Sequence, residues 1–218
     1  MIGDKLVIEP QHTERAAELC ALLADRVQPR WVLSVAGESG AGKSELAAEI
    51  ARLFNEQGHP TGILQQDDYF VFPPKTNHRM RQNNVEQVGP YEVKLDFLDS
   101  NLRSFKRGEN PLYKPLVIYD EDRITHEELD TSGVELLIAE GTYTSLLSFV
   151  DFRIFIDRDY VHTLEARKKR ARDEFDPFIQ RVLEREHRTI SAHKALADAQ
   201  VSTDFARVVL ASVTGKPS

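Results

Sequence analysis

Residues 37–44, with the letters GESGAGKS, match the phosphate-binding pattern G-x-x-x-x-G-K-[ST] without departure. Glycines let successive backbone amides point at phosphate oxygens, and the amino end of a following helix adds positive potential. In such a loop Lys43 contacts the β- and γ-phosphates, and the Ser44 hydroxyl is a Mg²⁺ ligand. The alternative is a glycine turn that only joins a strand to a helix. The apolar run before the motif and the amphipathic helix after it favour a phosphate site formed by Gly37, Glu38, Ser39, Gly40, Ala41, Gly42, Lys43 and Ser44.

Three acidic residues follow predicted strands. Asp67 and Asp68 come after the run 61–66, and Glu140 follows the apolar run 134–139 and precedes a glycine. In an open parallel sheet, ligands bind outside the carboxyl ends of the strands. A Mg²⁺-nucleotide site uses one or two carboxylates, and transfer to an alcohol uses another to accept the hydroxyl proton. The alternatives are a turn or helix cap for the two aspartates and an exposed loop acid for Glu140.

The elements that must position these residues alternate between strands and helices. Short apolar runs predict strands at 31–36, 61–66, 134–139, 152–156 and 206–210, and apolar periodicity predicts helices at 13–28, 44–57 and 95–105. Residues 71–94 show no sustained period, which indicates a long loop region of the functional kind. Residues 117–119 and 123–125 could form a short hairpin. The fold class is therefore α/β, with a mostly parallel sheet covered by helices on both faces.

Composition excludes several classes of protein. The chain has 218 residues, 41% of them hydrophobic and 29% charged, with a net charge of −7. One cysteine excludes an internal disulfide and is typical of a reducing compartment. No apolar run of membrane-spanning length and no signal-peptide pattern occur in the sequence, so we expect a cytoplasmic protein without a membrane partner. The acidic balance argues against nucleic acid as a partner.

A charged segment, residues 158–188, departs from this balance. It holds nine Lys or Arg and seven Asp or Glu, a net charge of +2; since the whole chain carries −7, the remainder carries −9. One interpretation is a solvated helix with ion pairs such as Glu184 with Arg188. The other is a helical lid, about 158–193, whose arginines close over a triphosphate and neutralise charge in the transition state. Because this segment follows a predicted phosphate-binding loop, the lid is the preferred interpretation. Arg167, Arg170 and Arg172 are the residues expected to contact the triphosphate.

Five segments together resemble the uridine kinase and phosphoribulokinase family of P-loop kinases, over nearly the whole chain from Trp31 to Leu210. They are the P-loop 37–44, the segment 66–70 (QDDYF), the segment 115–120, the segment 139–143 (AEGTY) and the basic run 167–173. The resemblance implies a P-loop NTPase three-layer sandwich plus a helical lid. It implies that 1–218 form a single kinase domain with an acceptor-binding insert at about 70–125. It also implies Asp67 as catalytic base and Glu140 as a metal ligand.

The acceptor is less closely defined by this resemblance. Uridine kinases carry a His shortly after the Tyr-Asp pair, whereas here none occurs until His126, and the order Tyr69-Phe70 is reversed. The segment 77–83 is basic, which suits a phosphate or carboxylate on the acceptor, although a solvated loop is the alternative. We expect the acceptor to contact Phe70, Arg79, Arg81, Tyr91, Tyr119 and Arg123.

We therefore predict an ATP- and Mg²⁺-dependent kinase that phosphorylates a hydroxyl of a small metabolite, such as a nucleoside like uridine, a sugar or a hydroxy acid. Ser44, Asp67 and Glu140 are the expected metal ligands, and Lys43 with the lid arginines would stabilise charge on the transferred group. Alternatives are a phosphorylated or carboxylated acceptor (a phosphosugar, glycerate or pantothenate) and a nucleotide-dependent switch or binding module. The sequence lacks the Asn-Lys-x-Asp guanine reader and the Leu-Ser-Gly-Gly signature of two such classes. A homo-oligomer is possible.

Overall fold

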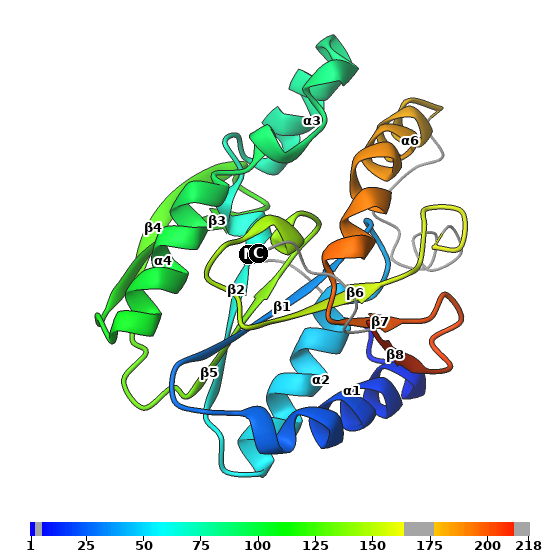
Figure 1. The fold of residues 1–218 in the computed structure, drawn as a ribbon. Helices are drawn as coiled ribbons and strands as arrows, with labels where there is room; N and C mark the ends of the chain where they lie inside the picture. The colour runs from blue at the N-terminus through cyan, green and yellow to red at the C-terminus, as the bar shows by residue number, and fades with distance from the viewer. Residues whose placement is uncertain (3–5, 164–176, 212–218) are drawn as a thin grey trace.

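Strands and helices alternate along the chain and build one central sheet (Figure 1). The computed structural model describes residues 1–2, 6–163 and 177–211. Six strands lie in the order β2-β5-β1-β6-β7-β8, and every neighbouring pair is parallel except β7 with β8. Their bounds are β1 Trp31–Gly37, β2 Thr61–Gln65, β5 Leu136–Glu140, β6 Phe152–Ile156, β7 Ala199–Val201 and β8 Val208–Leu210. The predicted α/β fold with a mostly parallel sheet is confirmed.

Helices cover both faces of this sheet. The α-helices are α1 Pro10–Leu23, α2 Lys43–Glu56, α3 Pro74–Asn83, α4 Leu95–Arg107 and α6 Pro177–Ile190. Short 3-10 helices are η1 Ala24–Arg26, η2 Gln66–Tyr69, η3 Val85–Gln87, η4 Pro90–Glu92, η5 Thr144–Leu146 and η6 Ser191–Leu196. Within the described ranges, no helix has the length and apolar character needed to cross a bilayer.

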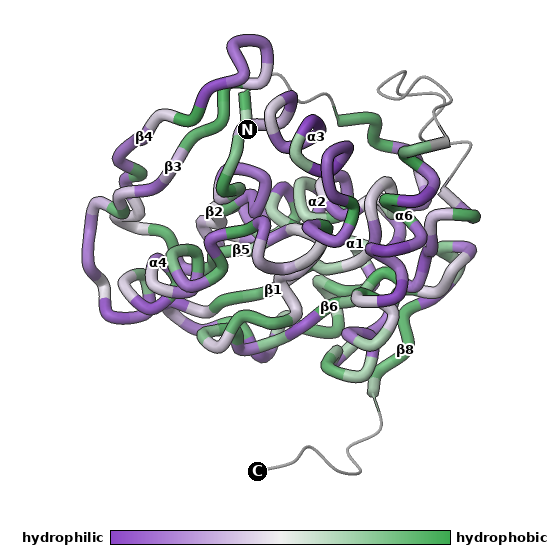
Figure 2. Tube along the Cα trace, turned by 90° about the horizontal axis from the view of Figure 1, so that it is seen from above, coloured by the Kyte–Doolittle hydropathy of each residue, from purple (hydrophilic) through white to green (hydrophobic). Residues whose placement is uncertain are grey.

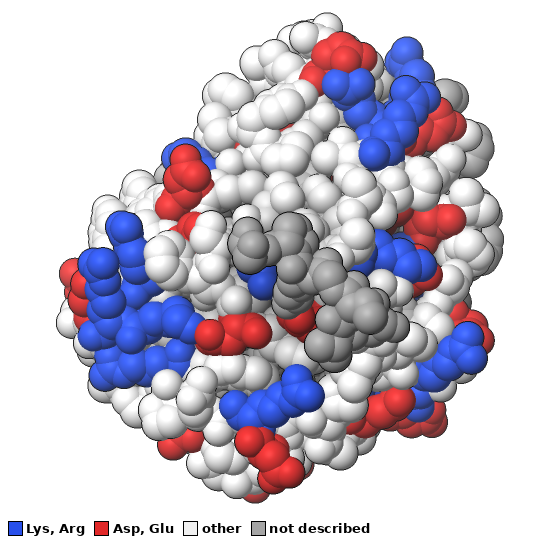
Figure 3. All heavy atoms as spheres, viewed as in Figure 1, with Lys and Arg blue, Asp and Glu red and all other residues white. Residues whose placement is uncertain are grey.

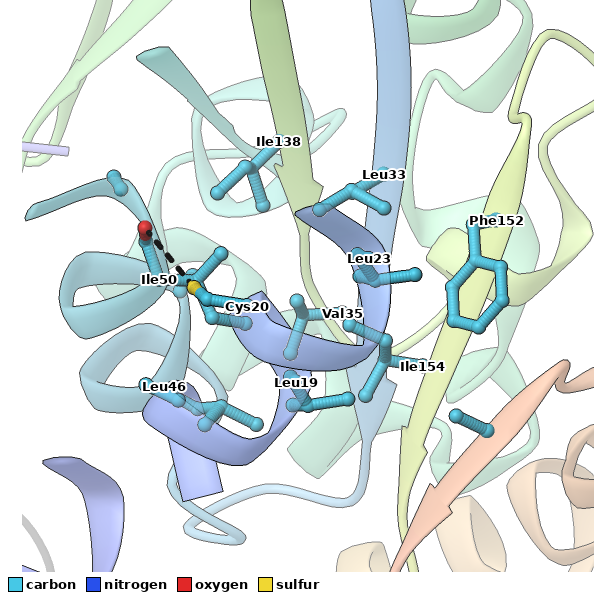
Figure 4. Close-up of a cluster of buried hydrophobic side chains, with 14 of the residues drawn as sticks. Leu19, Cys20, Leu23, Leu33, Val35, Leu46, Ile50, Ile138, Phe152 and Ile154 are labelled. Carbon is cyan, nitrogen blue, oxygen red and sulfur yellow. Dashed lines mark hydrogen bonds between the residues drawn. The ribbon is translucent and has the colours of Figure 1, made fainter. Parts of the chain in front are cut away.

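Alternating side chains of the buried strands feed two separate cores. On one face, Leu33 and Val35 of β1 pack with Leu19 of α1 and Ile50 of α2 (Figure 4). On the other face, Val32 of β1 belongs to a core that includes α4 side chains. Since β1 is buried at all seven positions, its continuous apolar run reflects coverage on both faces rather than a half-exposed strand.

A two-stranded antiparallel hairpin, β3 Leu112–Ile118 and β4 Arg123–Leu129, lies apart from the main sheet at the side of α4 (Figures 1 and 2). The hairpin predicted at 117–125 is confirmed, but it is longer than expected. β3 begins at Leu112 and continues through Pro115. A proline is tolerated there since each strand of a two-stranded ribbon has an unpaired edge.

The expectation of a long loop region over 71–94 was wrong, because α3 lies within it. Only Asn77 of α3 is buried, so this helix has no apolar stripe that periodicity could reveal. Its start is stabilised from a distant segment instead. The Asp122 carboxylate in the β3–β4 turn accepts hydrogen bonds from the backbone amides of Lys75 (2.7 Å) and Thr76 (3.2 Å), which otherwise lack helical partners.

Candidate functional site

The P-loop leaves the carboxyl end of β1 and turns into the first residues of α2. Gly40 and Gly42 have φ of +80° and +96°, a left-handed conformation that side-chain-bearing residues rarely adopt. A Cβ on Gly42 would also lie 2.9 Å from His12 Nε2. Lys43 Nζ donates to the Glu38 carbonyl oxygen at 2.9 Å, across the concave side of the loop. Strand, loop and helix thus have the arrangement that a phosphate cradle requires.

Glu140 is brought to the P-loop by strand register. β5 lies between β1 and β2, and Glu140 is paired with Val35 on one side and Gln65 on the other. The Ser44 hydroxyl lies 3.3 Å from both carboxylate oxygens of Glu140 and donates to that carboxylate. Burial, reinforced by the negative charge of Asp67, raises the pKa of Glu140 to about 7, while Lys43 acts in the opposite direction.

Asp67 lies at the end of β2, in the first turn of η2. Burial raises the pKa of the Asp67 carboxyl; the charge of Lys43 opposes this shift and the charge of Asp68 adds to it. Asp67, Glu140 and Lys43 therefore form one electrostatic group at the mouth of the P-loop. A carboxyl whose pKa is raised in this way is a better proton acceptor than an ordinary aspartate.

Ser44 and Glu140 offer the oxygen donors that Mg²⁺ prefers, and they lie next to the loop that would hold phosphates. No cluster of three or more His, Cys, Asp or Glu side chains suited to a metal ion occurs in the described part of the chain. That is compatible with Mg²⁺, because this ion keeps several waters and takes one or two protein carboxylates plus substrate phosphates. The residues present therefore fit a magnesium-nucleotide site.

Asp68 points away from the P-loop and joins the β3–β4 hairpin to the main sheet. It is buried, and its carboxylate accepts from Lys114 Nζ at 2.8 Å and from the Val117 amide at 2.9 Å. Lys114 Nζ also lies 2.8 Å from Glu127, and the Met1 amino group lies 3.0 Å from Asp68. The alternatives considered for Asp68 were a cap or turn and a catalytic acid; its contacts are those of a docking residue.

The predicted acceptor residues lie in three different settings. Arg81 is largely buried and makes a bidentate pair with Glu92, with Nε to Oε1 at 2.6 Å and Nη2 to Oε2 at 2.9 Å. Its positive charge partly offsets the rise that burial causes in the pKa of Asp67, so Arg81 belongs to the electrostatic surroundings of that carboxyl. Phe70 forms an isolated bridge with Val93 and packs against the second core.

Tyr119 and Arg79 each take part in a contact between the hairpin turn and α3. Lys75 Nζ lies 6.0 Å from the centre of the Tyr119 ring, and Arg79 Nη2 lies 3.5 Å from Asp122. Arg123 pairs with Glu121 on the surface at 2.7 Å.

Tyr91 is 61% exposed, and its hydroxyl contacts the Glu86 carbonyl. Contact of the acceptor with these residues stays a prediction.

Arg167, Arg170 and Arg172 of the predicted lid lie outside the described residues. The segments on either side of them both contact the P-loop through Glu38. Its carboxylate accepts from the Tyr160 amide at 2.8 Å, and its other oxygen lies 2.6 Å from Nδ1 of His187 on α6.

From the sequence, Glu38 was expected only in the cradle, and His187 was not predicted. The presence of an acidic side chain inside a predicted phosphate-binding loop is the signal in the sequence that could have singled out Glu38.

Gly141 allows the close approach of two strand ends. A Cβ at this position would lie 2.3 Å from Gln66 Cβ, so only glycine lets η2 lie against the end of β5. Gln66 Oε1 then accepts a hydrogen bond from the Tyr143 amide at 2.7 Å. This contact connects the segment that carries Asp67 to the segment that carries Glu140.

A family model described as the Phosphoribulokinase / Uridine kinase family matches residues 32–192. The chain belongs to this family. One relative is the bifunctional alpha-galactosidase/sucrose kinase AgaSK of Mediterraneibacter gnavus, 30% identical over 80% of this chain and 20% of its own length. Another is a uridine kinase of Saccharomyces cerevisiae, 27% identical over 67% of this chain and 31% of its own length. The chain therefore spans less than a third of either relative.

The fold of the family is also found among solved structures. A possible uridine kinase from Bacillus stearothermophilus is 21% identical and superposes with a TM-score of 0.60, covering 86% of this chain and 97% of that one. The P-loop, the Glu140 segment and the whole of α6 lie within the residues that the family model matches.

Proposed function

We propose that this protein is an ATP-dependent kinase that transfers the γ-phosphoryl group of Mg-ATP to a hydroxyl group of a small metabolite. The observation that carries the proposal is the grouping of Lys43, Glu140 and Asp67 at the mouth of the P-loop. Membership of the family supports the same activity.

In this mechanism the backbone amides of the P-loop and the Lys43 ammonium bind the phosphates and neutralise charge on the transferred group. Ser44 and Glu140 would hold Mg²⁺, which when bound would supply positive charge that stabilises the phosphates. Asp67 orients the acceptor hydroxyl and takes its proton. As the acceptor oxygen forms its bond to the γ-phosphorus, the bond between that phosphorus and the β–γ bridging oxygen breaks and ADP leaves.

We infer further that the acceptor is uncharged. The basic side chains that first suggested a phosphorylated or carboxylated acceptor already have acidic partners: Arg81 has Glu92, Arg79 has Asp122 and Arg123 has Glu121. An anionic acceptor would have to displace these carboxylates. A sugar or nucleoside would not, and the names of the relatives include a sucrose kinase and a uridine kinase.

The test is ADP release, coupled to a spectroscopic readout, with sucrose, D-fructose, uridine, D-glycerate and a pentose phosphate as acceptors. Asp67→Asn should reduce turnover of the best acceptor by about 10²- to 10⁴-fold while the Kd of ATP stays within about twofold. The matched control is Asp25→Asn, an exposed aspartate on η1, which should leave both quantities unchanged. Full turnover by Asp67→Asn would refute the role of this carboxylate. ATP hydrolysis without any acceptor would favour the nucleotide-dependent switch instead.

A further inference from the structure

Buried polar side chains beside this site have atoms without a hydrogen-bond partner among the described residues. They include Nε2 of Gln66, the hydroxyl of Tyr143, which is 1% exposed, and Oε2 of Glu186, which is 5% exposed. A buried polar atom left unsatisfied costs about 1–3 kcal/mol, more when it is charged. Such atoms are uncommon in folded proteins, and a bound ligand or water is the usual explanation.

Arg81 contacts one of these side chains, Glu186. Its Nη2 lies 3.4 Å from Glu186 Oε1, so one oxygen of Glu186 is paired and the other is not. Arg81 belongs to α3 and Glu186 to α6, two helices at the same end of the sheet in Figure 1. The two helices also contact each other directly through His78 and Phe178. The two rings pack edge to face, with their centres 5.6 Å apart.

Tyr143 lies in the same neighbourhood, from a third segment of the chain. Burial raises the pKa of its hydroxyl, and the negative charges of Glu186 and Glu92 add to that shift while Arg81 opposes it. Tyr143 follows Glu140 by three residues, and its amide is bound to Gln66, the residue before Asp67. The backbone of Tyr143 is therefore joined to the segment that carries Asp67, and the charges of Arg81 and Glu186 act on its hydroxyl.

We propose that Tyr143 and Glu186 bind hydroxyl groups of a neutral polyhydroxylated acceptor and so determine which acceptors this enzyme uses; the proposal rests on the kinase function above. A carboxylate oxygen accepts a hydrogen bond from a sugar hydroxyl, and a phenol both donates and accepts. Such groups suit the hydroxyls of a free sugar or of the ribose in a nucleoside. A phosphate or carboxylate would be repelled by the negative charge of Glu186. Arg81 neutralises this charge only in part, because it also pairs with Glu92.

The chemistry separates this role from a structural one. A structural pair would be satisfied within the protein, whereas here the phenol and one carboxylate oxygen are not. A site built to bind hydroxyls discriminates strongly against ligands without them, because its buried polar atoms then stay unpaired. Loss of either group should accordingly weaken acceptor binding and leave nucleotide binding unchanged.

The experiment measures binding and turnover separately. Calorimetry gives the Kd of sucrose, D-fructose, uridine, D-glycerate and ribulose 5-phosphate in the presence of Mg²⁺ and a non-hydrolysable ATP analogue. ADP release with ATP gives turnover. The variants are Tyr143→Phe and Glu186→Gln, each of which keeps the shape of the side chain. Matched controls are Tyr113→Phe, an exposed tyrosine stacked on His126, and Glu184→Gln, whose partner is Gln180 on the same helix.

We expect a neutral compound to bind. Its Kd should rise about three- to tenfold in Tyr143→Phe and about tenfold or more in Glu186→Gln, with the Kd of the nucleotide analogue unchanged. Both controls should bind as the unaltered protein does, and the melting temperatures report whether each variant is folded. Binding of uridine would identify the hydroxyls as those of a nucleoside ribose, and binding of sucrose or D-fructose would identify them as those of a free sugar.

Several outcomes would overturn the proposal: a neutral acceptor bound equally well by both variants, equal loss of nucleotide binding, binding of an anionic compound alone, or no binding at all. The kinase function is tested independently of this site. If a neutral compound bound through Tyr143 and Glu186 but was never phosphorylated, the kinase function would be refuted and the hydroxyl-binding site would stand. If only D-glycerate or ribulose 5-phosphate were phosphorylated, the kinase function would stand and the hydroxyl-binding site would be refuted.

Discussion

At the scale of single residues, the two consecutive aspartates illustrate how environment assigns chemistry. Asp67 shares its surroundings with Lys43 and Glu140, and burial raises the pKa of its carboxyl. Asp68 faces the opposite way and pairs with Lys114 and a backbone amide. The same side chain thus serves as the proposed base at one position and as a structural anchor at the next, because successive residues of η2 project in different directions.

Gly141 offers a prediction at this scale. Gly141→Ala should lower the free energy of unfolding by about 1–3 kcal/mol, because the new Cβ would lie 2.3 Å from Gln66 Cβ and push η2 away from β5. Urea unfolding at neutral pH measures the change. The same displacement should also weaken ATP binding, since Asp67 and Glu140 flank this contact.

Gly133→Ala is the control for this prediction. Gly133 has φ of +79°, and a Cβ there would meet nothing within 4 Å, so only backbone strain of about 1–2 kcal/mol applies. Its ATP affinity should stay unchanged. If both alanine variants bound ATP like the unaltered protein, the contact between Gln66 and Gly141 would not position the site.

At the scale of elements, the β3–β4 hairpin is held to the main sheet by a buried ion pair. Lys114 and Asp68 side chains are 6% and 3% exposed, with Nζ and Oδ2 2.8 Å apart. The hairpin turn in turn caps α3 through Asp122. The placement of the whole insert therefore depends on contacts between segments that are distant in sequence. The predicted acceptor residues on the insert are positioned by the same contacts.

Lys114→Met should lower the free energy of unfolding by about 3 kcal/mol, because the buried Asp68 carboxylate then loses its lysine ammonium partner. This is the lower end of the usual range, since the Val117 amide still donates to Asp68 and the Met1 amino group still pairs with it. Lys106→Met is the control: Lys106 and Asp151 are a partly exposed pair, which contributes about 1 kcal/mol or less. Equal losses in the two variants, measured by urea unfolding, would contradict a docking role for Lys114.

At the scale of the whole molecule, stability rests on two cores that share the central sheet. Cys20 of α1 lies in the core between α1, α2 and the sheet, with its Sγ 3.9 Å from the Ile50 carbonyl oxygen (Figure 4).

The basic side chains on the surface are concentrated in one region. On the face shown in Figure 3, Lys and Arg gather over α4, which contains Arg103, Lys106 and Arg107. The net charge of −7 is therefore not evenly spread.

Burial raises the pKa of the Cys20 thiol from 9.0 to about 12. Because the pKa is higher in the folded state than in the unfolded state, the thiol contributes its full stabilisation below about pH 9. That contribution is lost as the pH rises toward 12. We expect the difference in unfolding free energy between the unaltered protein and Cys20→Ala to fall by about 2 kcal/mol between pH 7.5 and pH 10.5. A difference that stays constant over this range would show that Cys20 is accessible to water.

Much of the nucleotide site was predictable from the sequence because its parts are local. The P-loop is one run of eight residues, and Asp67 and Glu140 each follow an apolar strand directly, so spacing alone predicts where they project. Parallel strands then bring their carboxyl ends to one edge of the sheet.

Only the tertiary structure decided what depends on contacts between distant segments. The register that pairs Glu140 with Val35, the capping of α3 by Asp122 and the pairing of Arg81 with Glu186 join residues far apart in the chain. Local propensity and periodicity carry no information about such pairs, since each is created by the packing of whole elements. The sequence by itself therefore determined where the proposed phosphate site lies, and the packing of the insert and α6 decided which groups surround the proposed acceptor site.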